Sequence, residues 1–283
     1  MKRGAMARRT LGCWAALSPL IVLTLFPFAV MLSTALKSNE DVLAYPPHWI
    51  PRHVVWGNFA AMWRASDFGT ALANSLGISL AATALSIAVA LPAAYAMARL
   101  PFRGRGFYRQ FLLVTQMLSP ILLVLGLFRL AAAIPFGDGT LVDTRVSLVV
   151  IYGAFNIAFA VWMLASYFQT IPRDLEEAAW IDGCGRTGAV LRIFLPVAVP
   201  AVAVTAIVSF VGAWNEFTVA LTLLRSPEKM TVTLRVVNLV AGRYSVEWNQ
   251  VMAATILATL PVAVMFACLQ RFLVKGLTLG AIK

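Results

Sequence analysis

Six long apolar runs, uncharged apart from Glu216, restrict most strongly how this chain can fold. A helix needs about 20 apolar residues to cross the roughly 30 Å hydrocarbon core of a bilayer. Runs of about this length occupy residues 11–35, 71–98, 110–128, 146–171, 197–223 and 250–270. Because a helix satisfies its backbone hydrogen bonds within the segment, we predict an all-α membrane protein with six transmembrane helices.

Composition and the placement of charge argue against two other classes of protein. Of the 283 residues, 60% are hydrophobic and only 12% are charged, too few to cover a water-soluble globule. The net charge of +11 falls in alternate loops rather than in a basic stripe, which argues against nucleic-acid binding. The three cysteines are far apart and indicate neither a disulfide framework nor a zinc site.

The loop charges predict the orientation. With a cytoplasmic N-terminus, the inside segments contain 14 of the 23 basic residues, whereas the outside loops are nearly balanced. This bias favours an N-in, C-in protein. A signal peptide is the alternative for the first run, but the run is too long for a signal core and lacks a clear cleavage site. We therefore interpret it as a span.

The chain shows one domain. We predict a single transmembrane domain over residues 1–283, with the first span at 11–35 and the core spans at about 71–274. No soluble domain, linker or internal repeat is visible. The longest outside segments, 36–70 and 224–249, contain the proline and aromatic residues expected at headgroup level.

The loop after the fourth run predicts a short helix outside the bilayer. Asp174 and Glu177 are spaced like a capping box, and Gly183 is a good helix stop. Ala178 and Ala179 have little bulk, so a partner surface could approach the backbone closely, with Glu177 as a charged rim. Such a helix suits docking into a groove of another protein.

The same loop carries a longer pattern of residues: Glu177, Ala178, Ala179, Gly183, Ile193, Leu195 and Pro196. At this spacing it resembles the cytoplasmic motif of permease subunits in binding-protein-dependent ABC importers. Further stretches resemble the carbohydrate-uptake branch, close to the small permease subunit of maltose-type systems, at residues 44–51, 74–76, 93–99, 214–217, 226–229 and 276–283.

The resemblance implies a type I ABC importer transmembrane domain, multi-pass in the inner membrane of a bacterium or archaeon. It implies four kinds of partner: membrane lipid, a second homologous permease in a heterodimer, two copies of a cytoplasmic ABC ATPase that uses ATP and Mg²⁺, and an extracytoplasmic solute-binding protein. The motif helix would be the coupling helix, within a coupling loop at 173–196. The solute would be a sugar or a sugar-like compound.

Two further groups of residues are candidates for contact with solute or partner. Polar side chains in the spans could line a solute path or gate, since sugars need hydroxyl partners and aromatic faces: Gln116, Tyr152, Asn156, Asn215, Glu216 and Thr218. Polar residues in membrane helices more often hydrogen-bond between helices, and for Glu216 the alternative is a position near the outer interface, reaching toward it or paired to a neighbouring subunit. The resemblance implies a binding-protein contact loop at Val240, Ala241, Gly242, Arg243, Tyr244 and Ser245, and a tail that contacts the ATPase.

The chain shows no catalytic motif of its own. Without a phosphate-binding loop or a nucleophile elbow, we expect no enzymatic activity and no cofactor on this chain. His48 and His53 lie in a proline-rich outside loop with no acidic or cysteine partner expected nearby, so we expect no metal site. A stand-alone secondary transporter or channel is the alternative function; it would require charged pairs or discontinuous helices in mid-membrane.

Overall fold

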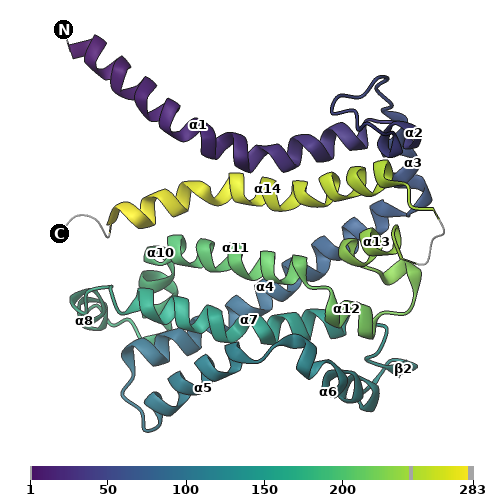
Figure 1. Ribbon diagram of the computed structural model, residues 1–283. Coiled ribbons are helices and arrows are strands. Elements are labelled where there is room, and N and C mark those ends of the chain that lie inside the picture. The colour runs from purple at the N-terminus through teal and green to yellow at the C-terminus, as the bar shows by residue number, and fades with distance from the viewer. Residues whose placement is uncertain (1, 242–244, 280–283) are drawn as a thin grey trace. The chain divides into compact units, whose positions relative to one another are not determined.

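The computed structural model describes residues 2–241 and 245–279 and consists almost entirely of helices (Figure 1). The longer helices are α1 (Lys2–Ala35), α4 (Phe68–Arg99), α5 (Arg105–Met117), α6 (Pro120–Ala133), α7 (Arg145–Phe168), α11 (Val199–Asn215) and α14 (Trp248–Leu279). The shorter ones are α2 (Asn39–Leu43), α3 (Gly57–Ala65), α8 (Asp174–Ile181), α9 (Arg186–Ala189), the π-helix η1 (Val190–Phe194), α10 (Leu195–Val197), α12 (Thr218–Leu223), the 3-10 helix η2 (Pro227–Lys229) and α13 (Val232–Asn238).

One small strand pair interrupts the helical pattern. The strands β1 (Pro135–Phe136) and β2 (Gly139–Thr140) pair antiparallel, with Pro135 opposite Thr140. Gly137, at a φ of +59°, lies in the turn between them. The sequence analysis predicted helices alone, because a hairpin of two-residue strands is too short to show a recognisable alternation.

Among the described residues, four helices are long and apolar enough to cross a membrane, and six spans result if each of two bent helix pairs counts as one. The four are Cys13–Ala35, Phe68–Arg99, Arg145–Phe168 and Trp248–Cys268. They coincide with the first, second, fourth and sixth apolar runs. The predicted multi-pass membrane class is therefore confirmed, while the third and fifth runs differ from simple straight spans.

The third run is broken into α5 and α6, which meet at 98°. Leu118 and Ser119, between the two helices, have extended backbone conformations. Pro120 then opens α6. Because proline has no amide hydrogen and pushes the preceding residue out of the helical region, the Ser119-Pro120 step ends one helix and begins another.

The fifth run is interrupted at both of its ends. A bend of 78° at Ala198 separates residues 187–197 from α11. Near the other end, Glu216 is extended at a φ of −68° and a ψ of 129°, so α11 stops at Asn215 and α12 begins at Thr218. The expected span of 197–223 is thus α11 followed by a separate two-turn helix.

The chain divides into two compact units. The first contains residues up to 68 together with 236–259. Within it, the Asn58 amide donates to the carbonyls of Ala35 and Lys37 at 2.8 Å each, and the Asn249 amide donates to the Asn58 side-chain oxygen at 3.3 Å. These bonds hold α3 and the start of α14 against the end of α1.

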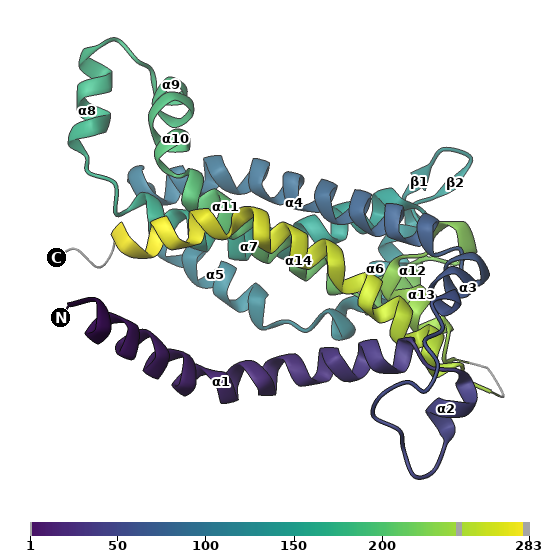
Figure 2. The ribbon, with the colours of Figure 1, turned by 90° about the horizontal axis from the view of Figure 1, so that it is seen from above.

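The second unit contains residues 69–235 and 260–279 and has two buried apolar clusters. Figures 1 and 2 show α8 at one end of α4, α7 and α11, and the group of β2, α12 and α13 at the opposite end. One cluster lies near each end: Phe168 and Phe194 belong to the first, Leu148 and Leu223 to the second. The ends carrying the candidate sites are therefore each supported by their own core.

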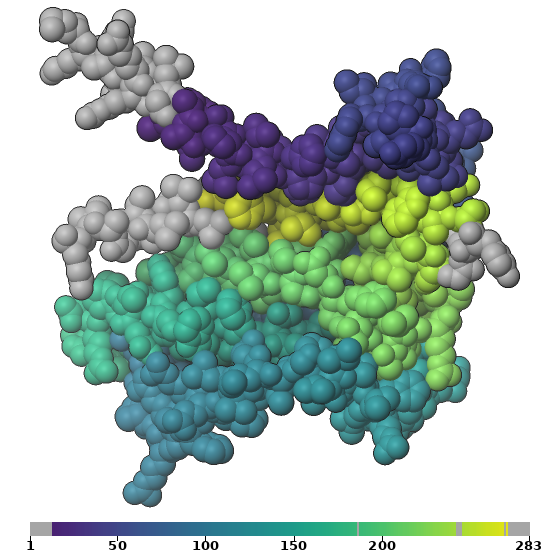
Figure 3. All heavy atoms as spheres, viewed as in Figure 1, coloured from purple at the N-terminus to yellow at the C-terminus, as the bar shows by residue number. Residues whose placement is uncertain are grey.

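Large apolar side chains are uncovered along α5 and α6. Met117 is 83% exposed, Leu122 76% and Leu125 74%. Figure 3 shows these two helices, coloured blue to teal, uncovered on the face that it draws. Such exposure is expected where a surface faces lipid or another subunit rather than water.

Candidate functional site

The predicted short helix exists as α8, and a glycine ends it. Gly183 has a φ of +78°, a left-handed conformation that costs a residue with a Cβ atom about 1 kcal/mol. This turn lets the Cys184 amide donate to the Ala179 carbonyl at 2.8 Å, which closes the last turn of the helix. The backbone itself therefore favours glycine at this position of the motif.

The start of α8 differs from the prediction. Arg173 is the N-terminal cap, and no side chain caps the helix. The Arg173 carbonyl accepts hydrogen bonds from the amides of Glu176 and Glu177 at 2.9 and 3.0 Å. Asp174 lies inside the first turn, so the predicted capping box of Asp174 and Glu177 is wrong. Three acids in the first turn still interact favourably with the helix dipole.

The two faces of α8 differ sharply. Glu176 and Ala179 are buried, whereas Glu177 and Ala178 are exposed. Only one alanine of the motif therefore faces outward. Three large apolar residues are exposed with it: Leu175 at 45%, Trp180 at 47% and Ile181 at 87%. A helix of eight residues that exposes so much apolar surface beside a carboxylate has the character of a docking element.

A shallow cavity adjoins this helix. It has a volume of about 160 Å³ and is lined by Arg99, Leu100, Pro101, Arg173, Glu176, Glu177 and Trp180. Figure 2 shows α8 projecting beyond the ends of α4 and α7.

The downstream part of the motif lies in an unusual helical segment. Ile193 is half-buried in η1, Leu195 is half-buried at the start of α10, and Pro196 is exposed. The fifth apolar run was predicted to begin at residue 197, directly after Pro196, whereas α11 begins at Val199 with Pro200 in its first turn. Pro196 instead precedes the 78° bend.

Four of the six candidate solute-path residues line one cavity of about 450 Å³ between α5, α7 and α11: Gln116, Tyr152, Asn156 and Glu216. The Gln116 amide donates to the Phe155 carbonyl at 3.2 Å, and the Asn156 amide donates to the Tyr152 carbonyl at 2.9 Å. Asn215 is exposed and Thr218 half-buried, and neither lines this cavity. Some of the polar groups that line the cavity are thus already hydrogen-bonded within the protein, and others are not.

Glu216 caps a helix at the edge of this cavity. Its carboxylate accepts hydrogen bonds from the Val219 amide at 3.0 and 3.2 Å and from the Ala220 amide at 3.3 Å. These amides are at the N-terminus of α12, where a negative charge is favoured. The Glu216 carboxylate is therefore paired with backbone amides at the break between α11 and α12.

The candidate binding-protein loop is only partly described. Gly242, Arg243 and Tyr244 lie outside the described residues. Val240 and Ala241 continue a turn after α13, in which both of their amides donate to the Val237 carbonyl, at 3.0 and 2.9 Å. Val240 and Ser245 are exposed.

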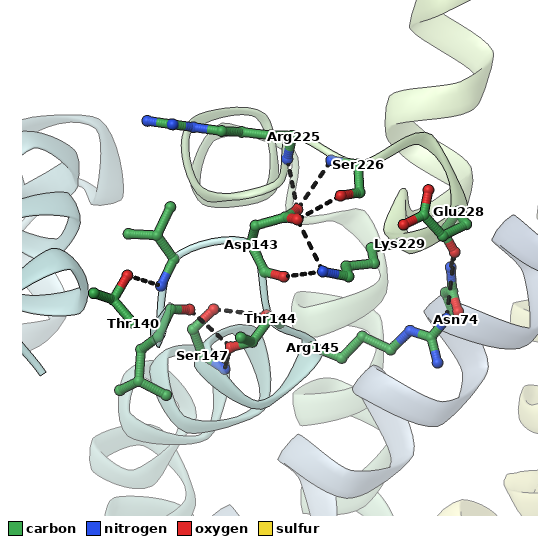
Figure 4. A network of polar contacts seen from close by, with 12 residues as sticks. Asn74, Thr140, Asp143, Thr144, Arg145, Ser147, Arg225, Ser226, Glu228 and Lys229 are labelled. Atoms are coloured by element: carbon green, nitrogen blue, oxygen red, sulfur yellow. Dashed lines mark hydrogen bonds and ion pairs between the residues drawn. The ribbon is translucent and has the colours of Figure 1, made fainter. Parts of the chain in front are cut away.

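A polar cluster at the end opposite α8 was missed by the sequence analysis (Figure 4). The Asp143 carboxylate accepts hydrogen bonds from the Arg225 and Ser226 amides at 2.8 and 3.0 Å, from the Ser226 hydroxyl at 2.5 Å and from Lys229 at 2.9 Å. On its other side, Asn74 donates to the carbonyls of Glu228 and Met230 at 2.9 and 3.0 Å. The segment between α12 and α13 is thus held from both flanks.

These contacts change the ionisation of Asp143. Partial burial would raise the pKa of its carboxyl group, but the hydrogen bonds from Ser226, Arg225 and Lys229 outweigh burial and lower the pKa well below the usual value of 3.8. Nothing in the sequence around Asp143 signals this role, because its partners are more than 80 positions away.

His48 has an acidic neighbour that the sequence did not indicate. Its Nδ1 atom lies 3.9 Å from an Asp41 carboxylate oxygen. Within the described residues, no group of three or more metal-ligating side chains is present.

The pairing of Arg99 with Glu176, on the buried face of α8, was also missed. Arg99, which the sequence analysis counted among loop charges, is the last residue of α4, and its Nε atom lies 3.4 Å from a Glu176 carboxylate oxygen. The two side chains are only 7% and 6% exposed. A charged residue directly at the end of an apolar run is the one signal that could have pointed to Arg99.

The arrangement of bent spans and an exposed loop helix has a counterpart in known proteins. The family described as binding-protein-dependent transport system inner membrane component matches residues 86–279, which include α8 and the whole motif. The chain belongs to this family. The resemblance predicted from the motif is therefore confirmed, and the discontinuous helices do not indicate a stand-alone secondary transporter.

Relatives of this inner-membrane component match it over nearly its full length. The sulfoquinovosyl glycerol transport system permease protein SmoH of Agrobacterium fabrum is 32% identical over 95% of this chain and 92% of its own. The trehalose transport system permease protein SugB of Mycobacterium tuberculosis is 33% identical over 98% of this chain and 100% of its own.

The fold of this inner-membrane component also matches a solved structure. A chain of a bacterial ABC transporter involved in the import of the acidic polysaccharide alginate has a TM-score of 0.78 and 20% identity, over 94% of this chain and 97% of the other. At this identity the likeness shows a shared fold, that of an ABC importer transmembrane domain.

Proposed function

We propose that this permease is one of two homologous membrane subunits of an ATP-driven importer for a sugar or sugar-like solute. It works with a second permease, two copies of a cytoplasmic ABC ATPase that bind ATP and Mg²⁺, and an extracytoplasmic solute-binding protein. The chain itself binds no cofactor and catalyses no reaction. The exposed apolar face of α8 beside Glu177, in a chain of this family, is the observation that carries the proposal.

Docking of the ATPase would use the outward face of α8. Ala178 allows close approach, Trp180 and Ile181 supply apolar area, and Glu177 supplies a charge that a basic partner residue can pair with. Gly183 shapes the end of the helix, while Ile193, Leu195 and Pro196 shape the return to α11. ATP-driven closure of the ATPase would then move α8.

The orientation follows from this assignment. The end of the molecule bearing α8 is cytoplasmic, in agreement with the positive charge of the loops predicted to be inside. The opposite end of the second unit, with the Asp143 cluster, faces outward.

The cavity beside α7 is a candidate stretch of the solute path. Asn156, Gln116 and Glu216 offer hydrogen-bonding groups, and the half-buried Phe155 offers aromatic surface, the combination that sugars require. Tyr152 also lines the cavity, but its side chain is buried. The names of SmoH and SugB, which refer to sugar-containing solutes, support the solute class.

The test is to purify the tagged chain gently with its associated proteins and to measure ATP hydrolysis with and without the loaded binding protein. We expect a second permease and an ATPase to copurify, and the loaded binding protein to stimulate hydrolysis. Glu177→Lys should abolish uptake while leaving membrane insertion intact, whereas the matched charge reversal Asp138→Lys, in the exposed hairpin turn, should not. A chain that purifies alone and well folded would refute the proposal.

A further inference from the structure

A buried ionic cluster joins α8 to the transmembrane helix α4. Arg99 Nε lies 3.4 Å from Glu176 Oε2, and the Tyr95 hydroxyl donates a hydrogen bond to Glu176 Oε1. Arg99 and Tyr95 are both on the last turns of α4, and Glu176 is in the first turn of α8. Both oxygens of one carboxylate on α8 therefore contact side chains of a single span.

Arg99 also reaches two other segments. Its Nη2 atom donates to the Ile171 carbonyl at 2.5 Å, in the turn that follows α7. Its guanidinium group lies 5.1 Å from the centre of the Phe194 ring in η1. Phe194 in turn makes edge-on contacts with Tyr95 and Phe168, with ring centres 5.2 and 5.5 Å apart. Arg99, at the end of α4, thus contacts the turn after α7, the helix α8 and the segment η1 that follows α8.

The burial of this cluster makes it a stiff connection. Water is nearly excluded from the pair, since the side chains are 7% and 6% exposed, so the attraction is poorly screened. Separating the pair would leave an uncompensated charge in a nonpolar setting, which is strongly unfavourable. Pro172 and Gly183, on either side of α8, are not helical, so α8 is not continuous with the helices before and after it.

We propose that the Arg99–Glu176 pair, braced by the Tyr95 hydroxyl, is the link that transmits movement of α8 to the membrane span α4. The assignment rests on the proposed docking of an ATPase on the exposed face of α8. The two neighbouring carboxylates then have different roles. Glu177 faces the partner, whereas Glu176, on the buried face, holds α8 to α4. Arg99, Glu176 and Tyr95 are positioning residues and need not contact solute or nucleotide.

The experiment compares variants in the complete reconstituted importer, with binding protein and solute supplied. ATP hydrolysis and solute uptake are measured on the same vesicles and expressed per assembled complex. Glu176→Gln keeps the shape of the side chain and removes its charge. We expect the number of solutes moved per ATP hydrolysed to fall about tenfold, within the range typical of energetic coupling between two sites.

Two further variants separate transmission from folding. Arg99→Lys keeps the positive charge but cannot contact Glu176 and the Ile171 carbonyl with one planar group, so we expect an intermediate loss of solute moved per ATP. The double exchange Arg99→Glu with Glu176→Arg should recover part of the loss of either single change. Asp138→Asn, in the exposed turn of the hairpin at the end opposite α8, makes the same chemical change outside the docking surface; it is the matched control and should behave like the wild type.

The outcomes distinguish this link from the proposed function. A role in stability alone would lower the amount of complex but leave the solutes moved per ATP unchanged in Glu176→Gln and Arg99→Lys, and that result would overturn the proposal. If the wild-type complex already shows uptake without any dependence on ATP hydrolysis, the importer function itself falls, and the link falls with it.

Discussion

Lys229 and Asp143 form an ion pair of 2.9 Å that joins the segment after α12 to the turn that precedes α7. Lys229 also donates to the Asp143 backbone carbonyl at 2.8 Å, so one ammonium group contacts both the side chain and the main chain of the same residue. With Asn74 on the other flank, the pair fixes the short helices α12 and α13 against the ends of two spans. A segment rich in turns is thereby given a defined position.

Removing the Asp143 carboxylate should loosen this end of the protein. Asp143→Asn loses the ion pair and weakens hydrogen bonds to two amides, which we expect to cost about 2 kcal/mol of unfolding free energy near neutral pH. Thermal unfolding in detergent measures the loss. Asp138→Asn, in the exposed turn of the hairpin, is the matched control and should change stability little.

The same contacts predict a pH dependence with a definite sign. Because the pKa of Asp143 is lower in the folded than in the unfolded protein, the unfolded state binds more protons in the acidic range. The stabilisation is therefore fully present above the usual value of 3.8 and declines as pH falls below it. The difference between wild type and Asp143→Asn should be constant from about pH 5 to pH 8 and shrink at about pH 3. A difference that grows on acidification would contradict this account.

The turn after α8 offers a paired glycine test. Gly183→Ala places a Cβ atom on a residue at φ +78°, so we expect a cost of about 1 kcal/mol and a displaced end of α8. ATP-dependent uptake by vesicles, normalised to the amount of inserted protein, should fall markedly. Gly185→Ala, two residues further and open to solvent, should leave uptake near the wild-type rate. Equal effects of the two changes would argue against a special role for the Gly183 turn.

The cavity predicts which polar residues affect solute handling. Asn156→Leu removes a polar side chain from the cavity wall, and we expect the rate of uptake to fall about threefold to tenfold, the range for one lost hydrogen bond. Asn215→Leu alters an exposed residue that does not line this cavity and should have a smaller effect. Initial rates at several concentrations of loaded binding protein provide the comparison. A larger loss in Asn215→Leu would move the solute path elsewhere.

The orientation can be tested by labelling from one side of the membrane. After Cys13, Cys184 and Cys268 are replaced by serine, single cysteines are introduced as Val237→Cys and Arg103→Cys, both at exposed positions. We expect an impermeant thiol reagent to label position 237 in intact cells and position 103 only after the membrane is opened. The reverse pattern would show that α8 lies outside and would exclude its contact with a cytoplasmic ATPase.

Local chemistry in the sequence was enough to predict several features of this protein. Long uncharged runs can be stable in a membrane only as helices, which gave the class and the approximate positions of the spans. The motif from Glu177 to Pro196 identified the family. Gly183 marked the end of α8, because the left-handed conformation that ends the helix is a local property of this residue. The break at Ser119-Pro120 was also present in the local sequence, although the apolar run concealed it.

Other features depend on partners far apart in the chain, and only the tertiary structure decided them. Arg99 and Glu176 are 77 positions apart and looked like two separate loop charges until the fold buried them together. Asp143 and Lys229 are 86 positions apart and carry no local signal of their pairing. Glu216 looked like an isolated acid in a span until the chain broke and supplied two amides at the start of α12. Sequence determined what each segment can be, because solvation and backbone preference act locally, whereas pairing of buried charges required the three-dimensional path of the chain.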